Sequence, residues 1–344
     1  MKKLVSLILA LALLLCFSGC GKYSDYADIT EYLTYEIIDG KVTITDCDEA
    51  VSGKVKIPKK IKGKPVTTLG NQAFSECKLI TDVVVPDSVT TFDYNVFLNC
   101  TSLKSVFVPS TVTKVGKKTF LGCSSLELIV VPDVFYTTIY CFSGCSSLKK
   151  FYLPEGITEI PFSLFSETAI ETITIPSSVK TISAEAFFDC NKLKTVVMEE
   201  GVVTIGTMAF RKTAIENIII PSSVTEIGRG AFLECESLQN VEIPSSITKI
   251  KDITFAGCSS LNNVHIPSSV IEIESAAFKN CTSLSNITFD EGIKSITHAV
   301  FENCVALKEI TFPKSLTELS EIAFGYNRNH YVDITFLGEP LLDD

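Results

Sequence analysis

Residues 224–244 read Val-Thr-Glu-Ile-Gly-Arg-Gly-Ala-Phe-Leu-Glu-Cys-Glu-Ser-Leu-Gln-Asn-Val-Glu-Ile-Pro, and the same pattern returns about every 23 residues. Self-similarity at this period is typical of a solenoid, in which each repeat is one turn of a coil. Because a solenoid grows by stacking, the length of 344 residues reports the number of coils and not of globular domains. One phenylalanine marks each copy, at gaps of 22 or 23 residues: Phe74, Phe97, Phe120, Phe142, Phe165, Phe187, Phe210, Phe232, Phe255, Phe278, Phe301 and Phe324.

Each copy contains a short strand with a period of two. In the copy at 224–244, Val241 and Ile243 are expected to point into the core, while Asn240 and Glu242 point outward. Pro244 ends the strand because proline cannot donate to a ladder. Stacking such strands predicts a parallel β-sheet on one face of the solenoid, with short turns or 3-10 segments on the other.

The composition narrows the possible functions. Apolar residues make up 46% of the chain and charged residues 20%, which is enough for a continuous core and too few charges for disorder. The formal net charge of −10 argues against non-specific binding of nucleic acid, which needs a basic surface.

Residues 1–19 have the form of an export signal. Lys2 and Lys3 precede an apolar run from Leu4 to Phe17, which is too short to span a bilayer and suits a signal peptide. The segment Ser18-Gly19-Cys20 resembles a bacterial lipobox, although Phe17 stands where leucine is usual. The resemblance implies cleavage before Cys20 and a lipid on its thiol, and two or more acyl chains would hold the protein on a membrane. The alternative is a plain secreted protein.

The segment that precedes the repeats is expected to have two parts. Residues 20–34 are polar and predict a spacer. Residues 35–65 predict a β-hairpin cap and a first strand, because alternating runs flank Asp39-Gly40, a dipeptide that favours a type I′ turn. Six lysines between positions 54 and 64 favour a solvated edge over a binding patch.

Three copies are one residue shorter than the others. Two of them replace the Cys-x-x-Leu block with Thr168-Ala-Ile or Thr213-Ala-Ile. The third, Pro132 to Phe142, is irregular and contains Phe135, Tyr136 and Tyr140. These aromatic residues could contact a ligand, but local repair of a deletion is the favoured interpretation.

The consensus Val-Thr-x-Ile-Gly-x-x-Ala-Phe-x-x-Cys-x-x-Leu-x-x-Val-x-Ile-Pro resembles the BspA-like class of leucine-rich repeats over residues 55–336. The resemblance implies a right-handed leucine-rich-repeat coil over residues 66–336, with about 12 coils of 22–23 residues and a tail at 337–344. It also implies a bacterial surface protein associated with adhesion, and no catalysis. Such analogy fixes core positions far better than binding positions.

Nine cysteines share one position, three residues after the marker phenylalanine. A zinc site would need Cys or His pairs two to four residues apart, and this spacing does not occur at that position. A disulfide ladder is conceivable outside the cell. Thr168 and Thr213 occupy the same position in two copies, however, which favours a small, half-polar core slot.

No stretch has a catalytic signature. His265, His298 and His330 fall in three different coils, and no nucleophile elbow, phosphate loop or metal-binding helix motif is present. We therefore expect no enzyme, no metal and no cofactor.

The outward strand positions are the remaining candidates for binding a partner. They change from apolar and aromatic to polar along the chain, and an exposed apolar patch usually marks an interaction site. The alternative is that parallel strands favour such residues in any case, and the outward Asn residues are expected to form a hydrogen-bonded ladder. The candidate partner-binding residues are Val84, Phe107, Leu128, Val130, Tyr152, Glu242 and His265.

These observations predict an exported protein, lipid-anchored through Cys20 to the outer side of a bacterial cell membrane. Its exposed sheet face is expected to bind a protein ligand on host or neighbouring cells, with no nucleic acid as partner. The alternative is a structural spacer of the cell envelope without a specific ligand. A transporter's solute-binding protein is excluded, because uniform coils leave no room for two lobes around a cleft.

Overall fold

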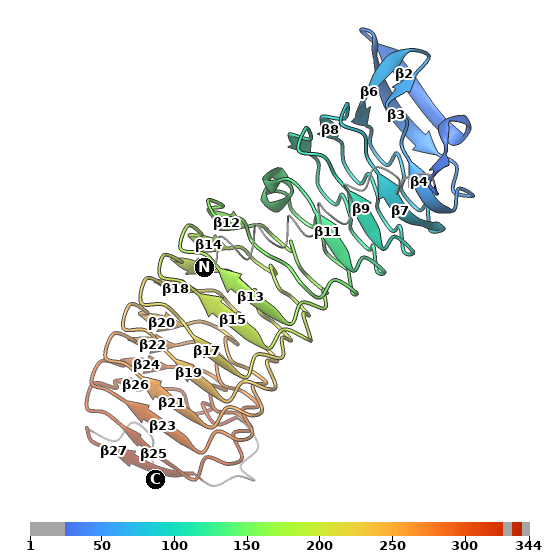
Figure 1. Cartoon of the computed structure of the whole chain (residues 1–344). Coiled ribbons are helices and arrows are strands. Elements are labelled where there is room, and N and C mark those ends of the chain that lie inside the picture. Colours follow the sequence, from blue (N-terminus) through green and yellow to red (C-terminus); the bar gives the residue numbers. More distant parts are fainter. Residues whose placement is uncertain (1–24, 326–331, 339–344) are drawn as a thin grey trace. The chain divides into compact units, whose positions relative to one another are not determined.

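The computed structural model describes residues 25–325 and 332–338 (Figure 1). The predicted leader, Cys20 and His330 lie outside these residues, as does most of the predicted tail. The chain divides into two compact units, residues 1–152 and 153–344. The solenoid has about 13 turns, against the 12 expected, because a strand at Gly53–Lys56 adds a rung before the first coil that we counted.

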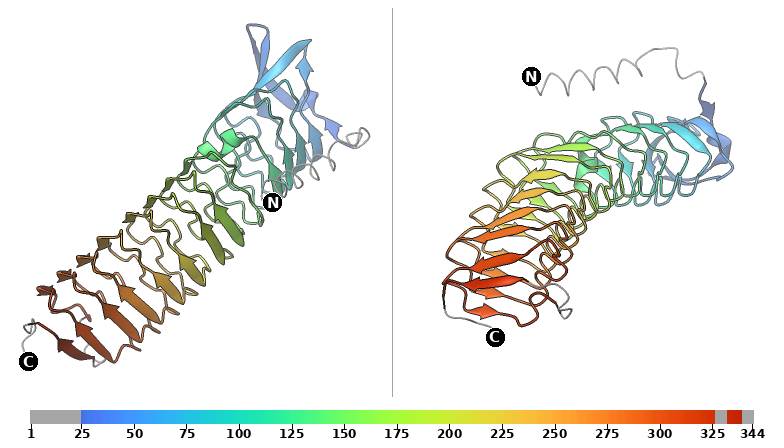
Figure 2. Two further views of the ribbon diagram at one scale, coloured as in Figure 1. Left: turned by 60° about the vertical axis from the view of Figure 1, so that its left-hand side comes forward. Right: turned by 90° about the horizontal axis from the view of Figure 1, so that it is seen from below.

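Unit 2 repeats one coil with little variation, and its strands lie side by side in every view (Figure 2). The larger ladder is parallel and in register, and paired residues are counterparts in successive coils, as Asn217 pairs with Asn240. Its strands are β13 (Thr172–Ile175), β15 (Thr195–Met198), β17 (Asn217–Ile219), β19 (Asn240–Glu242), β21 (Asn263–Ile266), β23 (Asn286–Phe289), β25 (Glu309–Phe312) and β27 (Asp333–Phe336). Strand pairing is interrupted between β15 and β17 and between β23 and β25.

A second parallel ladder follows the other side of unit 2. The repeat pattern predicted turns here, and turns do surround the marker phenylalanines, but two-residue strands precede them. These strands are β12 (Glu159–Ile160), β14 (Thr181–Ile182), β16 (Thr204–Ile205), β18 (Glu226–Ile227), β20 (Lys249–Ile250), β22 (Glu272–Ile273), β24 (Ser295–Ile296) and β26 (Glu318–Leu319), and strand pairing is interrupted between β18 and β20.

Unit 1 also has two ladders. The larger follows the order β1-β4-β7-β9-β11 and the smaller the order β10-β8-β6-β3-β2, with β5 paired to β6. The strands of the larger ladder are β1 (Ala27–Asp28), β4 (Gly53–Lys56), β7 (Ile80–Val84), β9 (Ser105–Phe107) and β11 (Leu128–Val130). Those of the smaller are β2 (Leu33–Ile38), β3 (Lys41–Cys47), β5 (Lys60–Ile61), β6 (Lys64–Leu69), β8 (Thr91–Phe92) and β10 (Lys114–Val115).

The predicted hairpin is present. Strands β2 and β3 are antiparallel, and the residues of the turn between them, Asp39 and Gly40, have φ angles of 51° and 73°, as a type I′ turn requires. The folded part begins earlier than the predicted spacer at 20–34 allows. Strand β1 pairs with β4, a 3-10 turn η1 (Thr30–Tyr32) follows it, and Ile29 is buried.

The marker phenylalanines form the core of both units. Those of unit 2 stack as offset parallel pairs, with ring centroids 5.3–5.6 Å apart from Phe165 to Phe278. The backbone around each one bonds directly to the next coil, as when the amide of Phe210 donates to the carbonyl of Ala231 at 2.8 Å. In most coils, the residues two before and two after the phenylalanine have a left-handed backbone. This conformation points the amides of the turn toward the carbonyls of the next coil.

The irregular copy at 132–142 is a packing repair, as predicted. It contains a 3-10 turn η2 (Asp133–Thr137) where a strand of the smaller ladder would stand. Phe135 is fully buried, edge-on to Phe92 at 5.5 Å and stacked on Phe120 at 5.9 Å. Tyr136 packs on Phe151 at 5.3 Å, and burial raises the pKa of its phenol.

Candidate binding surface

In-register pairing sorts the outward side chains of the larger ladders into two parallel columns in each unit. Because successive strand residues face opposite sides, two residues per coil reach the surface. In unit 2 one column contains Asn217, Asn240, Asn263 and Asn286. In the other, Ile219 pairs with Glu242 and His265 with Thr288, and Val197 has the equivalent position on β15.

The predicted apolar positions of unit 1 are exposed to different degrees. Val130 is 40% exposed and Tyr152 54%, whereas Phe107 is half-buried. The prediction was wrong for Val84, which is only 8% exposed. It lies in register between Lys56 and Phe107, whose longer side chains stand on either side of it. Leu128 lies on β11, and its side chain is not among those that the structure describes.

The strands of the larger ladder in unit 2 expose two large apolar side chains outside the predicted set. Ile219 is 75% exposed, and Val197 is 47% exposed on the preceding strand of the same column. The outward residues around them are Thr172, Thr174 and Asn217, so this part of the face was classified as polar. The strand pattern places Ile219 at an outward position, but the pattern alone does not indicate how far its side chain is exposed.

Hydrogen bonds between neighbouring coils link polar residues within both columns of unit 2. The Nδ2 of Asn240 donates to the Oδ1 of Asn217 at 3.1 Å, which confirms the predicted ladder at this rung. His265 is exposed and lies between two partners, with Nδ1 3.0 Å from the Oγ1 of Thr288 and Nε2 3.3 Å from the Oδ2 of Asp290. Glu242 is exposed one rung away.

The repeated cysteines form a core ladder, and no described cysteine is in a disulfide. The thiol of Cys235 donates to the carbonyl of Phe210 in the preceding coil at 3.0 Å, and Cys258 repeats this contact with Phe232 at 3.2 Å. In the shortened coils, Thr168 and Thr213 fill the same slot. Burial raises the pKa of both Cys190 and Cys235 to about 11, so these thiols stay protonated and unreactive at neutral pH.

The described residues hold no group of three or more His, Cys, Asp or Glu side chains placed to bind a metal ion. Within the same ranges, no helix is long and apolar enough to cross a bilayer.

Two parallel ladders, a stacked phenylalanine column and 22–23-residue coils define a leucine-rich-repeat solenoid. The model of the BspA-type leucine-rich repeat region matches residues 51–138, 133–239 and 203–331. The chain therefore belongs to the BspA-type leucine-rich-repeat family.

The chain is similar to bacterial leucine-rich-repeat proteins of known structure. A leucine-rich cell surface protein from Faecalibacterium prausnitzii A2-165 is 27% identical, with a TM-score of 0.55, over 90% of this chain and 94% of that chain. A leucine-rich-repeat protein from Eubacterium ventriosum ATCC 27560 is 21% identical, with a TM-score of 0.49, over 92% of this chain and 96% of that chain. No curated protein matches the sequence.

Proposed function

We propose that this protein is exported, lipid-anchored through Cys20 on the outer side of a bacterial membrane, and binds a protein ligand through the outward face of its larger ladders. The observation that carries the binding proposal is the exposure of Ile219, 75% exposed on a strand where no packing requirement places an isoleucine. Large apolar side chains on a rigid surface are suitable anchors for a protein partner.

The composition of the face favours a protein ligand over a small molecule. Apolar anchors with polar residues around them resemble the core and rim of a protein interface. In unit 2, Val197 and Ile219 would form such a core, and Asn217, Asn240 and Glu242 would lie at its rim. Membership of the family and the likeness to a cell surface protein of Faecalibacterium prausnitzii support the surface location.

A pull-down with the full chain against extracellular-matrix and bacterial-surface proteins, followed by titration of each captured ligand, tests the binding proposal. Val197→Ser combined with Ile219→Ser should weaken binding roughly tenfold or more, as expected for the loss of interface anchors. Val203→Ser combined with Ile271→Ser is the matched control, since these residues are also exposed, at 39% and 46%, but lie outside the larger ladder.

The two variants distinguish the alternatives. Equal affinity of the face variant and the wild type would exclude the Val197–Ile219 surface. A pull-down that captures nothing would favour the envelope spacer. Mass spectrometry of the mature chain tests the anchor separately, by the presence of acyl chains on Cys20.

A further inference from the structure

Two hairpin turns lie side by side at one end of the smaller ladder of unit 1. Strand β6 is parallel to β3 and pairs with it from Val42 and Val66 onward, so the starts of these two strands are adjacent. Each start follows a tight turn with both residues left-handed: Asp39-Gly40 before β3 and Lys62-Gly63 before β6. We call residues 37–41 and 60–64 the twin-hairpin tip (Figure 1).

The tip projects beyond the body of unit 1. Neighbouring residues of a strand face opposite sides, so one of each pair is normally covered by the core. Ile37 is 41% exposed and its neighbour Ile38 62% exposed, because β2 is the edge strand of the smaller ladder. Val42, which pairs with Ile37, and Ile61 of the second hairpin are buried, so the core covers one side of the tip and the two isoleucines of β2 remain open to solvent.

The tip is also locally basic. Lys41, Lys60, Lys62 and Lys64 are all exposed, and Lys62 lies 5.7 Å above the ring of Tyr35, which links the two hairpins. The same segment contains two acidic residues, Glu36 and Asp39, so its four lysines leave it with a net positive charge.

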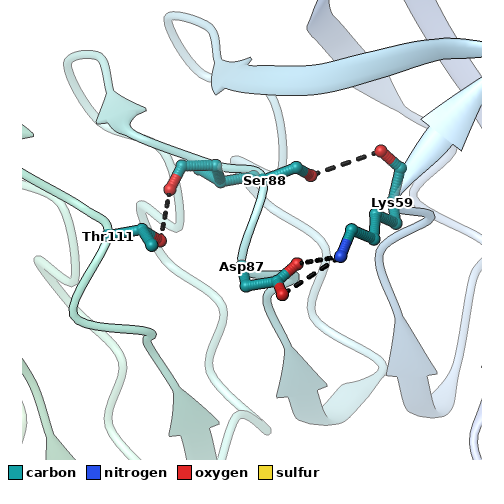
Figure 3. Close-up of polar contacts among 5 residues, drawn as sticks. Lys59, Asp87, Ser88 and Thr111 are labelled. Atoms are coloured by element: carbon teal, nitrogen blue, oxygen red, sulfur yellow. Dashed lines mark hydrogen bonds and ion pairs between the residues drawn. The ribbon is translucent and has the colours of Figure 1, made fainter.

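The nearby Lys59 does not add to this charge. Its Nζ is 2.7 Å from the Oδ1 of Asp87, and its carbonyl accepts a bond from the hydroxyl of Ser88 (Figure 3). These contacts tie the base of the second hairpin to the following coil and neutralise Lys59. The basic charge is therefore concentrated at the projecting end.

Apolar side chains flanked by lysines on a projecting element fit the interface of an anionic bilayer, where the apolar groups enter the headgroup region and the lysines contact lipid phosphates. The charge of the rest of the chain supports this orientation. The whole chain has a net charge of −10, so an anionic surface repels most of it and attracts this tip.

The chain that leads to unit 1 supplies the second argument. Four residues lie between Cys20 and Asp25, the first described residue, and the five steps along the chain span at most about 18 Å. An anchor at Cys20 would hold unit 1, the unit that carries the tip, close to the membrane. We propose that the twin-hairpin tip docks on the anionic lipid surface of the membrane that holds the chain. The membrane's identity rests on the anchor proposed above.

The absence of tryptophan makes a clean test possible. Ile38→Trp places a single indole at the tip, and the full chain carrying it is mixed with phosphatidylglycerol vesicles that contain a doxyl-labelled quencher lipid. We expect the indole emission to shift to the blue and to be quenched, with both effects weaker at high salt or with phosphatidylcholine alone.

Ile219→Trp is the matched control, because it puts an indole on another exposed strand residue, in unit 2. Any general affinity of indole for lipid appears in both variants, so only Ile38→Trp should be quenched. Adding Lys41→Gln, Lys60→Gln and Lys64→Gln should shift the equilibrium away from the docked tip about a hundredfold, at about fivefold per lysine. The same three-lysine change at Lys192, Lys294 and Lys314 should leave the tip docked.

The outcomes separate docking from anchoring. Emission of Ile38→Trp that stays solvent-like on vesicles at saturating lipid overturns the docking proposal, whether or not the chain floats with the vesicles. Quenching without acyl chains on Cys20 by mass spectrometry keeps the docking proposal and refutes the anchor. Equal quenching of both indoles also overturns the proposal, because the tip is then not the contact.

Discussion

The shortened coils of the two units respond differently to the loss of one residue. In unit 2, the coils with Thr168 and Thr213 lose it in the turn after the phenylalanine. The smaller ladder β12-β14-β16-β18 continues past them, although the larger ladder is interrupted between β15 and β17. In unit 1, the coil at 132–142 loses it ahead of the phenylalanine, and η2 replaces the strand. The position of a deletion therefore decides its consequence. When the residue is lost from the turn, a threonine hydroxyl takes the place of the cysteine thiol and the smaller ladder continues. When it is lost from the strand, the strand does not form and Phe135 fills its space.

The surfaces of the two units also differ, and for a related reason. Unit 2 repeats its coil closely enough for outward residues to stack on their own kind, as the four Asn residues from 217 to 286 do. Unit 1 has the cap, the basic tip and an aromatic outward residue, Tyr152. Features that do not repeat are the ones on which both proposals depend.

The largest expected effect is a loss of stability when a core phenylalanine is removed, from the irregular coil of unit 1 or from the regular column of unit 2. Phe135→Ala in unit 1 and Phe232→Ala in unit 2 each remove a fully buried ring, and we expect both to lower the free energy of unfolding by about 3–5 kcal/mol. Urea unfolding measures the loss, and hydrogen exchange shows in which unit protection disappears. A loss below about 1 kcal/mol for Phe135→Ala alone would mean that its pocket is not packed for stability, and would reopen the ligand interpretation.

The second effect concerns the cysteine slot. Burial raises the pKa of Cys235 from 9.0 to about 11, so the folded chain keeps a proton that the unfolded chain releases. The contribution of the protonated Cys235 thiol to the free energy of unfolding is therefore complete below pH 9. It is lost as the pH rises towards 11, at about 1.4 kcal/mol per pH unit.

Cys235→Thr removes this dependence, because Thr213 already fills the slot of the preceding coil. At neutral pH we expect a cost of about 1 kcal/mol from the altered shape. Between pH 9 and 11 the wild type should lose about 2–3 kcal/mol more than the variant, as measured by urea unfolding at each pH. Parallel pH profiles would contradict a buried, protonated Cys235.

The sequence predicted the coil, the hairpin, the cysteine slot and the local repair at 132–142. The residue types at these places are enough to indicate burial or a particular turn. It did not predict the second ladder, since two-residue strands have no alternation to detect. It also misjudged Val84, because exposure at an outward position depends on the size of neighbours one rung away, here Lys56 and Phe107. The twin-hairpin tip was missed for a similar reason: its lysines were counted along the chain, while their concentration depends on the pairing of β3 with β6.

The smallest expected effect lies at the left-handed corner of the coil. Two residues before the phenylalanine, Asn95 in unit 1 has a φ of 59°, which asparagine tolerates, whereas Ile253 in unit 2 has a φ of 49°, where a β-branched residue is strained. Ile253→Asn should raise the free energy of unfolding by up to about 1 kcal/mol, because the relief of 1–2 kcal/mol is partly offset by lost contacts of the half-buried side chain.

The matched change in the other unit is Asn95→Ile, which should destabilise unit 1 by a similar amount. Thermal unfolding of both variants measures the pair. Opposite signs would show that the corner imposes the same backbone in both units, although its residues have nothing in common. A loss of stability in Ile253→Asn would instead mean that side-chain contacts along the coil outweigh the strain. In that case the left-handed backbone would be stabilised by side-chain packing in unit 2 and by the tolerance of asparagine for positive φ in unit 1.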